Sequence, residues 1–118
     1  MSDAYELFQQ GRRHLRGGKA AQAAVALEQA KRREPEKASI REALGIAYLR
    51  LRRYDVAAAE FRKILELAPA DDFAHYALGR CLEQQGRRVE ANGHYKLACS
   101  LRPDDERYAA RIVDLSAS

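Results

Sequence analysis

Histidine and cysteine are the residues of this chain whose side chains most often carry out catalysis or bind metals. The chain has two cysteines, Cys81 and Cys99, and three histidines, His14, His75 and His94. The cysteines form no CxxC motif, have no histidine at ligand spacing and fall within apolar helical patterns, which indicates buried thiols in a reducing compartment. No serine sits in a nucleophile motif, and no glycine-rich loop follows a strand pattern. We therefore expect no catalytic residue, no metal site and no cofactor, and a protein that is not an enzyme.

Charged residues are frequent in the chain and carry both signs. It has 21 Lys and Arg against 17 Asp and Glu, for a net charge of +4. This balance is compatible with nucleic-acid binding but does not require it. The start MSDAYELF lacks the features of a signal peptide, and no apolar run approaches the ~20 residues that span a bilayer. We expect a cytoplasmic protein with no membrane partner.

Three prolines divide the chain into equal units. Pro35, Pro69 and Pro103 are 34 residues apart, and each follows a segment with apolar residues at i, i+3, i+4 and i+7. Because proline cannot continue a helix, each one marks a helix end. The same spacing relates three further sets of residues: Gly11, Gly45 and Gly79, then Ala23, Ala57 and Ala91, then Leu27, Phe61 and Tyr95. A period of this length predicts a repeated helical hairpin.

The repeated pattern resembles that of the tetratricopeptide repeat family. The middle unit matches the family pattern at every slot except the opening aromatic, where Arg41 stands. Its matching residues are Leu44, Gly45, Tyr48, Ala57, Phe61 and Pro69. The resemblance implies an all-α fold, a right-handed α-solenoid of three helical hairpins with a seventh, capping helix, in a single domain over 1–118. The repeats are expected at 4–37, 38–71 and 72–105, with the capping helix at 105–116. The expected helices are 4–16, 20–32, 38–51, 54–67, 72–85 and 88–100, and a seventh at about 105–115.

Small residues at fixed slots indicate where helices pack most closely. Gly45 and Ala57 are expected where the two helices of a hairpin approach most closely, whereas we find no reason for Gly93 in the sequence.

The stripe that faces a preceding unit is apolar in the second and third units but polar in the first, where it reads Glu6, Gln10 and Arg13. The apolar stripe of the capping helix consists of Tyr108, Ala109, Ile112 and Leu115. Both ends therefore look finished, and we expect a complete domain and a monomer, with a dimer through a side face left open.

The resemblance also implies a place for a ligand, since the first helix of each tetratricopeptide hairpin lines a concave groove that binds peptides. The peptide-binding residues expected here are Tyr5, Phe8, Arg12, Arg16, Glu42, Ile46, Arg50, Phe73, Tyr76 and Arg80. The family's best-known groove chemistry is a clamp of Lys, Asn and Arg on a C-terminal carboxylate. We do not expect that clamp, because its places here hold Phe8, Arg12, Ala43, Phe73 and Ala77.

Aromatic and arginine side chains in such a groove favour a protein-protein interaction module, an adaptor or scaffold, whose partner segment has acidic and apolar side chains. The aromatics can instead pack against neighbouring helices, and the arginines can pair with Glu42 or Glu83. The histidines fit core packing better than catalysis, because two of them hold slots that the repeat usually fills with an aromatic.

Charge also divides between the two edges of the expected solenoid. The turns within hairpins carry Arg16, Lys19, Arg52, Arg53, Arg87 and Arg88. The turns between hairpins carry Glu34, Glu36, Asp71, Asp72, Asp104, Asp105 and Glu106. Helix capping and the helix dipole explain part of the acidic edge. The basic edge allows an alternative function, binding of a nucleic acid or another polyanion, although few aromatics interleave with it and nucleic acid is not the preferred partner. Self-association through the convex face is a further alternative.

Overall fold

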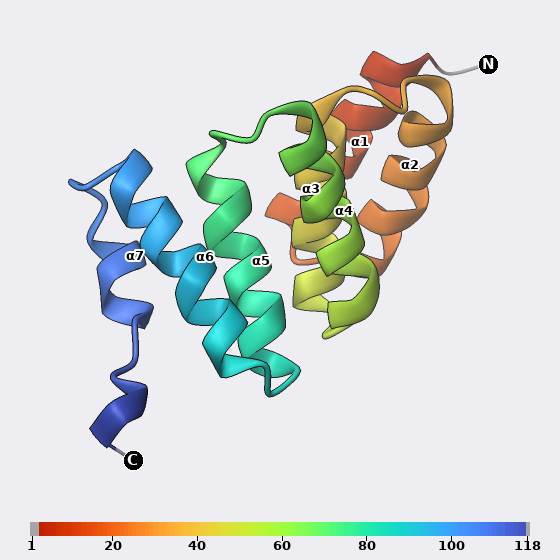
Figure 1. Cartoon of the computed structure of the whole chain (residues 1–118). Helices are drawn as coiled ribbons and strands as arrows, with labels where there is room; N and C mark the ends of the chain where they lie inside the picture. Colours follow the sequence, from red (N-terminus) through yellow and green to blue (C-terminus); the bar gives the residue numbers. More distant parts are fainter. Residues whose placement is uncertain (1–2, 118) are drawn as a thin grey trace.

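The computed structural model describes residues 3–117, and the regular structure in that range is entirely helical. The helices are α1 Ala4–Arg16, α2 Ala20–Arg33, α3 Ala38–Arg50, α4 Tyr54–Leu67, α5 Asp72–Gln84, α6 Arg88–Leu101 and α7 Glu106–Arg111, followed by the 3₁₀ helix η1 Leu115–Ala117. The first six match the expected ranges to within one residue at each end (Figure 1). The expected all-α fold is therefore confirmed.

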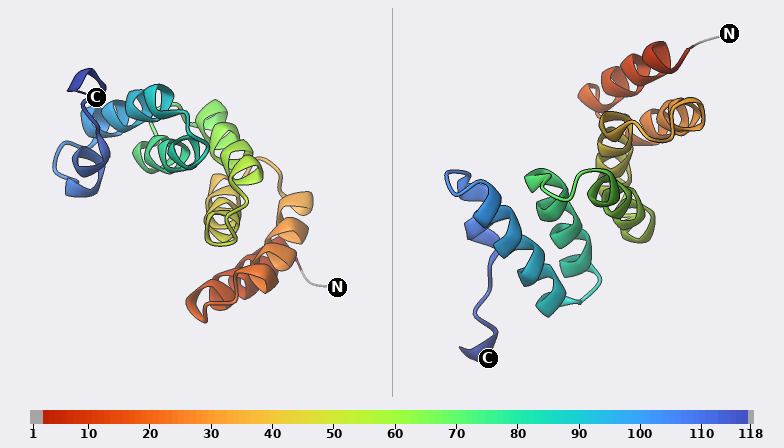
Figure 2. Two further views of the ribbon diagram at one scale, coloured as in Figure 1. Left: turned by 90° about the horizontal axis from the view of Figure 1, so that it is seen from below. Right: turned by 45° about the horizontal axis from the view of Figure 1, so that its top comes forward.

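The hairpins stack into an elongated arc of 55 × 24 × 22 Å. Figure 2 shows α1, α3 and α5 on the inner side of this arc, with α2, α4 and α6 behind them. The α3–α4 and α5–α6 turns lie at the lower edge in Figure 1, whereas the α2–α3 and α4–α5 connections lie at the upper edge. The first helices of the hairpins thus present their side chains to one continuous concave face.

A glycine in the first helix of each hairpin admits a large side chain from the second helix. A Cβ atom on Gly45 would lie 2.6 Å from the Phe61 ring, and one on Gly79 would lie 2.5 Å from the Tyr95 ring. Gly11 bears the same relation to Leu27 in the first hairpin. The expectation for Gly45 is confirmed, because the packing of a buried ring outweighs a helix-propensity loss of about 1 kcal/mol.

The Arg41 slot, which departs from the repeat pattern, ties each hairpin to the connection before it. Arg41 donates from Nε to the carbonyl of Pro35 (2.9 Å) and from Nη1 to Glu60 (3.0 Å). His75 is the equivalent residue in the third hairpin, and its Nε2 donates to the equivalent carbonyl, that of Pro69 (2.9 Å). In both hairpins a polar side chain therefore satisfies a carbonyl that the repeat would otherwise leave without a donor.

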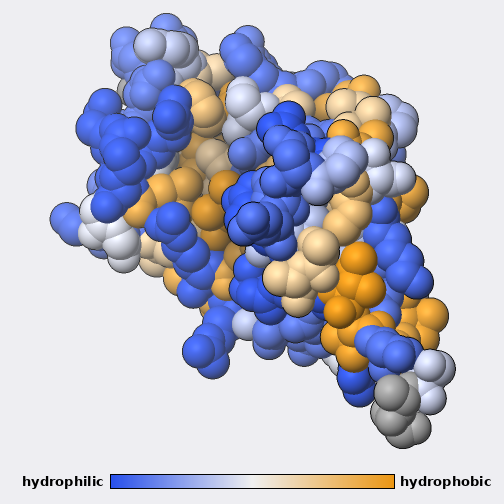
Figure 3. Space-filling view, turned by 90° about the vertical axis from the view of Figure 1, so that its left-hand side faces the viewer, coloured by the Kyte–Doolittle hydropathy of each residue, from blue (hydrophilic) through white to orange (hydrophobic). Residues whose placement is uncertain are grey.

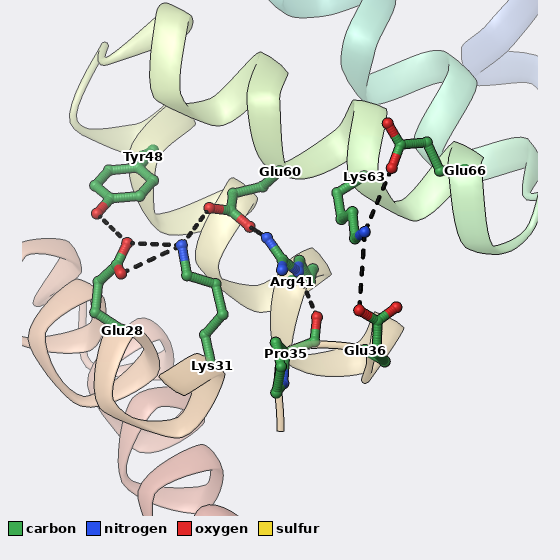
Figure 4. A network of polar contacts seen from close by, with 9 residues as sticks. All are labelled: Glu28, Lys31, Pro35, Glu36, Arg41, Tyr48, Glu60, Lys63 and Glu66. Atoms are coloured by element: carbon green, nitrogen blue, oxygen red, sulfur yellow. Dashed lines mark hydrogen bonds and ion pairs between the residues drawn. The ribbon is translucent and has the colours of Figure 1, made fainter. Parts of the chain in front are cut away.

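Glu60 is also the centre of a charged network between the first two hairpins (Figure 4). It accepts from Lys31 at 2.8 Å, and Lys31 in turn pairs with Glu28 at 3.3 Å. The Tyr48 hydroxyl donates to Glu28 at 2.7 Å. Burial and this hydrogen bond raise the pKa of Tyr48 to about 12. The network joins α2 to α3 and α4, so it fixes the register of one hairpin on the next.

The prediction of a capping helix over 105–115 is wrong in its extent. α7 ends at Arg111, and Ile112 adopts an extended conformation. The buried side chain of Asn92 explains this end, because its amide donates to the Val113 carbonyl (2.6 Å) and accepts from the Val113 N–H (3.0 Å). These two bonds tie the backbone of Val113 to α6, so the chain leaves the helix at Ile112. Of the expected apolar stripe, Tyr108 is fully buried whereas Ala109 is exposed.

The face around α7 retains apolar surface. Figure 3 shows this face, with an apolar area beside the C-terminal end. Val89 is 75% exposed and Val113 41% exposed, and both line a hollow between α6 and residues 112–115. At the other end of the array, Glu6, Gln10 and Arg13 are exposed as expected.

Candidate functional site

Two hollows lie side by side along the inner face of the arc. The α1–α3 hollow has a volume of about 230 Å³ and is lined by Phe8, Arg12, Leu15, Ser39, Glu42, Ala43 and Ile46. The α3–α5 hollow has a volume of about 440 Å³ and is lined by Ile46, Leu49, Arg50, Tyr54, Phe73, Tyr76, Ala77, Arg80, Gln84 and Arg107. Because Ile46 lines both, the two hollows form one groove that runs across three helices.

The α3–α5 hollow is rich in positive charge. Arg50, Arg80 and Arg107 line it, and no lining residue is a carboxylate. Arg107 is neutralised by Asp105 (2.7 Å), and Arg50 donates to the Leu15 carbonyl (2.7 Å). Arg50 and Arg80 form no ion pair within residues 3–117. The hollow therefore keeps a positive charge that its own lining does not compensate.

Arg80 is the least satisfied of these arginines. Its Nη1 donates to the Tyr76 hydroxyl at 3.3 Å, whereas its Nε is buried without a hydrogen-bond partner within the described residues. A buried donor of this kind costs about 1–3 kcal/mol unless something accepts from it. The guanidinium of Arg80 therefore lines the hollow with fewer hydrogen bonds than it can form.

Aromatic rings form the floor of the α3–α5 hollow. Tyr76 is only 9% exposed, and its ring lies 5.0 Å from that of Tyr108 and 6.0 Å from that of Phe73. The guanidinium groups of Arg80 and Arg107 lie 5.9 Å and 5.6 Å from the Tyr76 ring centre, within reach of a cation–π interaction. Tyr76 is therefore chiefly a packing residue that orients two arginines, and Phe73, which is half-buried, is the more accessible ring of the predicted pair.

The α1–α3 hollow has a mixed charge. The Arg12 guanidinium lies 5.6 Å from the centre of the Phe8 ring, and Glu42 stands among the lining residues from α3. Burial, together with the nearby Asp71 and Asp72, raises the pKa of Glu42. Arg12 and Glu42 form no ion pair with each other, so the alternative in which Glu42 neutralises a groove arginine is not seen for this pair.

Most of the predicted peptide-binding residues meet in the groove, and two lie outside both hollows. Tyr5 is 66% exposed and lines a separate hollow of about 130 Å³ at the start of α1, together with Phe8. Arg16 is exposed at the end of α1. Tyr54 of α4 and Arg107 of α7 also line the α3–α5 hollow, and the repeat pattern does not predict them, because neither belongs to the first helix of a hairpin.

The two cysteines were the other side chains considered for chemistry. Cys81 is buried and Cys99 partly buried, both as free thiols, and burial raises the pKa of Cys81 to about 11. Residues 3–117 contain no group of three or more metal-ligating side chains, and no helix there has the length and apolarity needed to cross a membrane.

Known proteins are similar to this chain in sequence or in fold. The chain is 31% identical over 97 residues to Superkiller complex protein 3 of Mus musculus, an alignment that spans 82% of this chain but 6% of that protein. Its fold is similar to that of the first TPR of Spaghetti bound to an HSP90 peptide, with a TM-score of 0.89 and 19% identity over 93% of this chain and 87% of the other. It is also similar to the type III secretion chaperone SycD of Yersinia enterocolitica in complex with a peptide, with a TM-score of 0.85 and 16% identity over 92% and 88% of the two chains.

Profiles of the tetratricopeptide repeat match nearly all of the hairpin array. One covers residues 8–72 and a second covers 72–105, so their shared boundary coincides with the start of α5. Together with the three stacked hairpins and their glycine and proline positions, these matches show that the chain belongs to the tetratricopeptide repeat family.

Proposed function

We propose that this protein is a non-enzymatic interaction module that binds a partner segment with acidic and apolar side chains in the groove formed by the α1–α3 and α3–α5 hollows. The observation that carries the proposal is Arg80, which has no ion-pair partner among the described residues and lines a hollow that combines aromatic and apolar side chains with no carboxylate. An acidic side chain in the hollow would pair with this guanidinium, because a guanidinium binds a carboxylate in a fixed geometry.

The apolar part of the proposed ligand follows from the rest of the lining. Ile46, Leu49 and Phe73 are partly exposed side chains of the groove. A side chain placed over them would bury their remaining surface at about 25 cal/mol per Å². Since Ile46 belongs to both hollows, an apolar residue of the partner would lie at the centre of the groove with the acidic residue toward Arg80. Arg12, which holds the same repeat slot as Arg80, would receive a second acidic side chain at the α1 end.

Proteins of similar fold support this use of the groove. The Spaghetti domain is described with an HSP90 peptide, SRMEEVD, and SycD with a peptide of a translocator. The HSP90 peptide contains both acidic and apolar residues, although the clamp positions of this chain differ from the family's usual set. We infer that a segment of related composition binds here with different contacts.

Selection from a displayed library of random peptides tests the proposal even though the partner is unidentified. We expect enrichment of sequences in which Asp or Glu stands near a large apolar residue, and we expect Arg80→Glu and Arg12→Glu each to weaken the selected peptides at least tenfold, since a charge-assisted hydrogen bond contributes about 1.5–3 kcal/mol. Arg13→Glu is the matched control, because Arg13 is adjacent to Arg12 but lies on the outer face of α1.

The result depends on whether the variants keep their fold. Circular dichroism should show the same helix content for all three variants, since each changed side chain is at least partly exposed. Selected peptides that are basic, or that bind Arg80→Glu as well as the unchanged protein, would refute the groove as the binding surface.

A further inference from the structure

The edge formed by the turns within the hairpins is a basic surface outside the groove. It consists of Arg16, Lys19, Arg52, Arg53, Arg87 and Arg88, all of which are exposed. Repeat geometry places these turns on the same side of the array, as Figure 1 shows for the α3–α4 and α5–α6 turns. We name this set the hairpin-turn edge.

The two edges of the solenoid differ in how their charges are paired. At the edge between hairpins, basic side chains neutralise the acids, in the pairs Lys37 with Glu34, Lys63 with Glu36, Arg102 with Asp72 and Arg107 with Asp105. At the hairpin-turn edge, the ion pair seen within residues 3–117 is that of Arg87 with Glu90. The remaining five cations there have no carboxylate of the described residues at ion-pair distance. The hairpin-turn edge therefore keeps five cations that no ion pair among the described residues neutralises.

Arg52 is an independent sign that this edge has a role. It has a φ of 59°, and the residues at the same turn position in the other two hairpins are Gly18 and Gly86, with φ of 73° and 80°. The turns are otherwise alike, since Arg53, Lys19 and Arg87 all donate their N–H to the carbonyl five residues back. A left-handed conformation is unfavourable for a residue with a Cβ atom, and strained residues of this kind gather at functional sites. An arginine held where glycine fits better adds charge at the centre of the edge.

The shape of the hairpin-turn edge favours one kind of anionic partner. None of the hollows described above includes Lys19, Arg52, Arg53 or Arg88 in its lining. A peptide bound there would lack the pockets that anchor side chains at protein interfaces. A nucleic acid needs no such pocket, because its closely spaced phosphates bind Lys and Arg through charge and counterion release.

We propose that the hairpin-turn edge binds the phosphodiester backbone of a nucleic acid, without reading its bases, and that it does so independently of the groove. Arg52, Arg53 and Arg88 would contact phosphates at the centre of the edge. Arg16 and Lys19 would extend the contact to the first hairpin. Tyr54, the aromatic residue next to Arg53, lines the α3–α5 hollow, so the proposal assigns backbone contacts alone to the edge, since base recognition in single strands relies on stacking.

Fluorescence anisotropy with a labelled single-stranded oligonucleotide of about 20 nucleotides tests the proposal, and a duplex of similar length shows which form binds. With four to five phosphate contacts, we expect affinity to fall about a thousandfold between about 20 mM and 200 mM salt. The double variant Arg53→Glu with Arg88→Glu should lose at least tenfold in affinity at low salt. Arg52→Gly should weaken binding about threefold while raising the melting temperature, because it removes both a charge and a strained backbone.

A second double variant controls for net charge. Arg32→Glu with Arg33→Glu makes the same change in charge at exposed positions near the opposite edge, and it should leave binding within about twofold of the unchanged protein. The proposal is overturned if the unchanged protein does not bind at low salt, or if both double variants lose affinity equally. A polyglutamate peptide that competes as effectively as the oligonucleotide itself, at the same concentration of charges, would also overturn the proposal. That result would assign the edge to an acidic protein segment.

Discussion

At the residue scale, one pair of repeat slots is filled in different ways in the second and third hairpins. The second hairpin holds Arg41 with Glu60, an ion pair, and the third holds His75 with His94, whose Nδ1 atoms lie 3.1 Å apart. His75 must donate from Nε2 to the Pro69 carbonyl, so its Nδ1 is the acceptor and His94 is the donor. The hydrogen bond between the two rings therefore needs the Nδ1 proton on His94 and none on the Nδ1 of His75.

The histidine pair leads to a prediction about pH. Burial, then the neighbouring His75 and Arg62, lower the pKa of His94, and Glu90 acts in the opposite direction. Because its folded pKa lies below its unfolded value, near 6.5, the unfolded chain binds more protons as pH falls. The stability that this group contributes is therefore complete above about pH 6.5 and is lost as pH decreases below it. We expect urea unfolding to show a lower free energy of unfolding at about pH 5.5 than at about pH 7.5.

Comparison with a variant isolates the contribution of the pair. His94→Asn keeps a donor near the position of Nδ1 and does not titrate, so the pH-dependent loss of stability should become smaller. His14→Gln removes a partly exposed histidine elsewhere and should leave the loss unchanged. The same pH dependence in His94→Asn and in the unchanged protein would show that the pair is not the source.

Two glycines within helices should respond in opposite directions to alanine. A Cβ atom on Gly93 would meet nothing within 4 Å, so Gly93→Ala should raise the free energy of unfolding by about 1 kcal/mol through helix propensity alone. Gly45→Ala should lower it by about 1–3 kcal/mol, because the added methyl group overlaps the Phe61 ring. Chemical denaturation of both variants measures the two changes, and a destabilised Gly93→Ala would show that the glycine has a role that this packing does not explain.

At the scale of elements, the end of α7 depends on one side chain. Asn92 is 7% exposed and forms both of its hydrogen bonds with the backbone of Val113. Asn92→Ala should lower the free energy of unfolding by about 1–2 kcal/mol, since each bond contributes about 1 kcal/mol. Hydrogen exchange at the Val113 amide should accelerate. Unchanged protection of that amide would mean that other contacts hold the segment.

The end of α7 is also the feature that local sequence does not predict. The first six helices follow from the 34-residue period, because a proline follows the second helix of each hairpin and a glycine marks the closest contact of its first helix. The end of α7 follows from Asn92, which is 21 residues from its partner Val113 in sequence and lies in no repeat slot. The period also indicates which arginines of the first helices line the hollows, whereas the burial of Tyr76 and the presence of Arg107 depend on how α7 crosses the end of the array.

At the scale of the whole molecule, the chain behaves as a row of units that each contact their neighbours, so its stability is a sum of unit and interface terms. The network around Glu60 is the polar part of the first interface. The side chain of Glu60 is 7% exposed, and it bonds Lys31 from the first hairpin and Arg41 from the second. An interface that depends on buried charge is sensitive to the loss of one partner, because the others remain without compensation.

Glu60→Ala should therefore separate the first hairpin from the rest. We expect the free energy of unfolding to fall by about 2–3 kcal/mol. This is near the lower end of the range for removing one partner of a buried ion pair, because the side chain of Lys31 is 22% exposed. Hydrogen exchange should accelerate most in α1 and α2, with little change in α5 and α6, since coupling in a repeat array passes only between adjacent units. Glu90→Ala removes the exposed pair with Arg87 and should change stability by less than about 1 kcal/mol. If Glu60→Ala accelerated exchange equally in all three hairpins, the array would unfold as one cooperative unit, and the groove that spans these hairpins would then be lost together with the first interface.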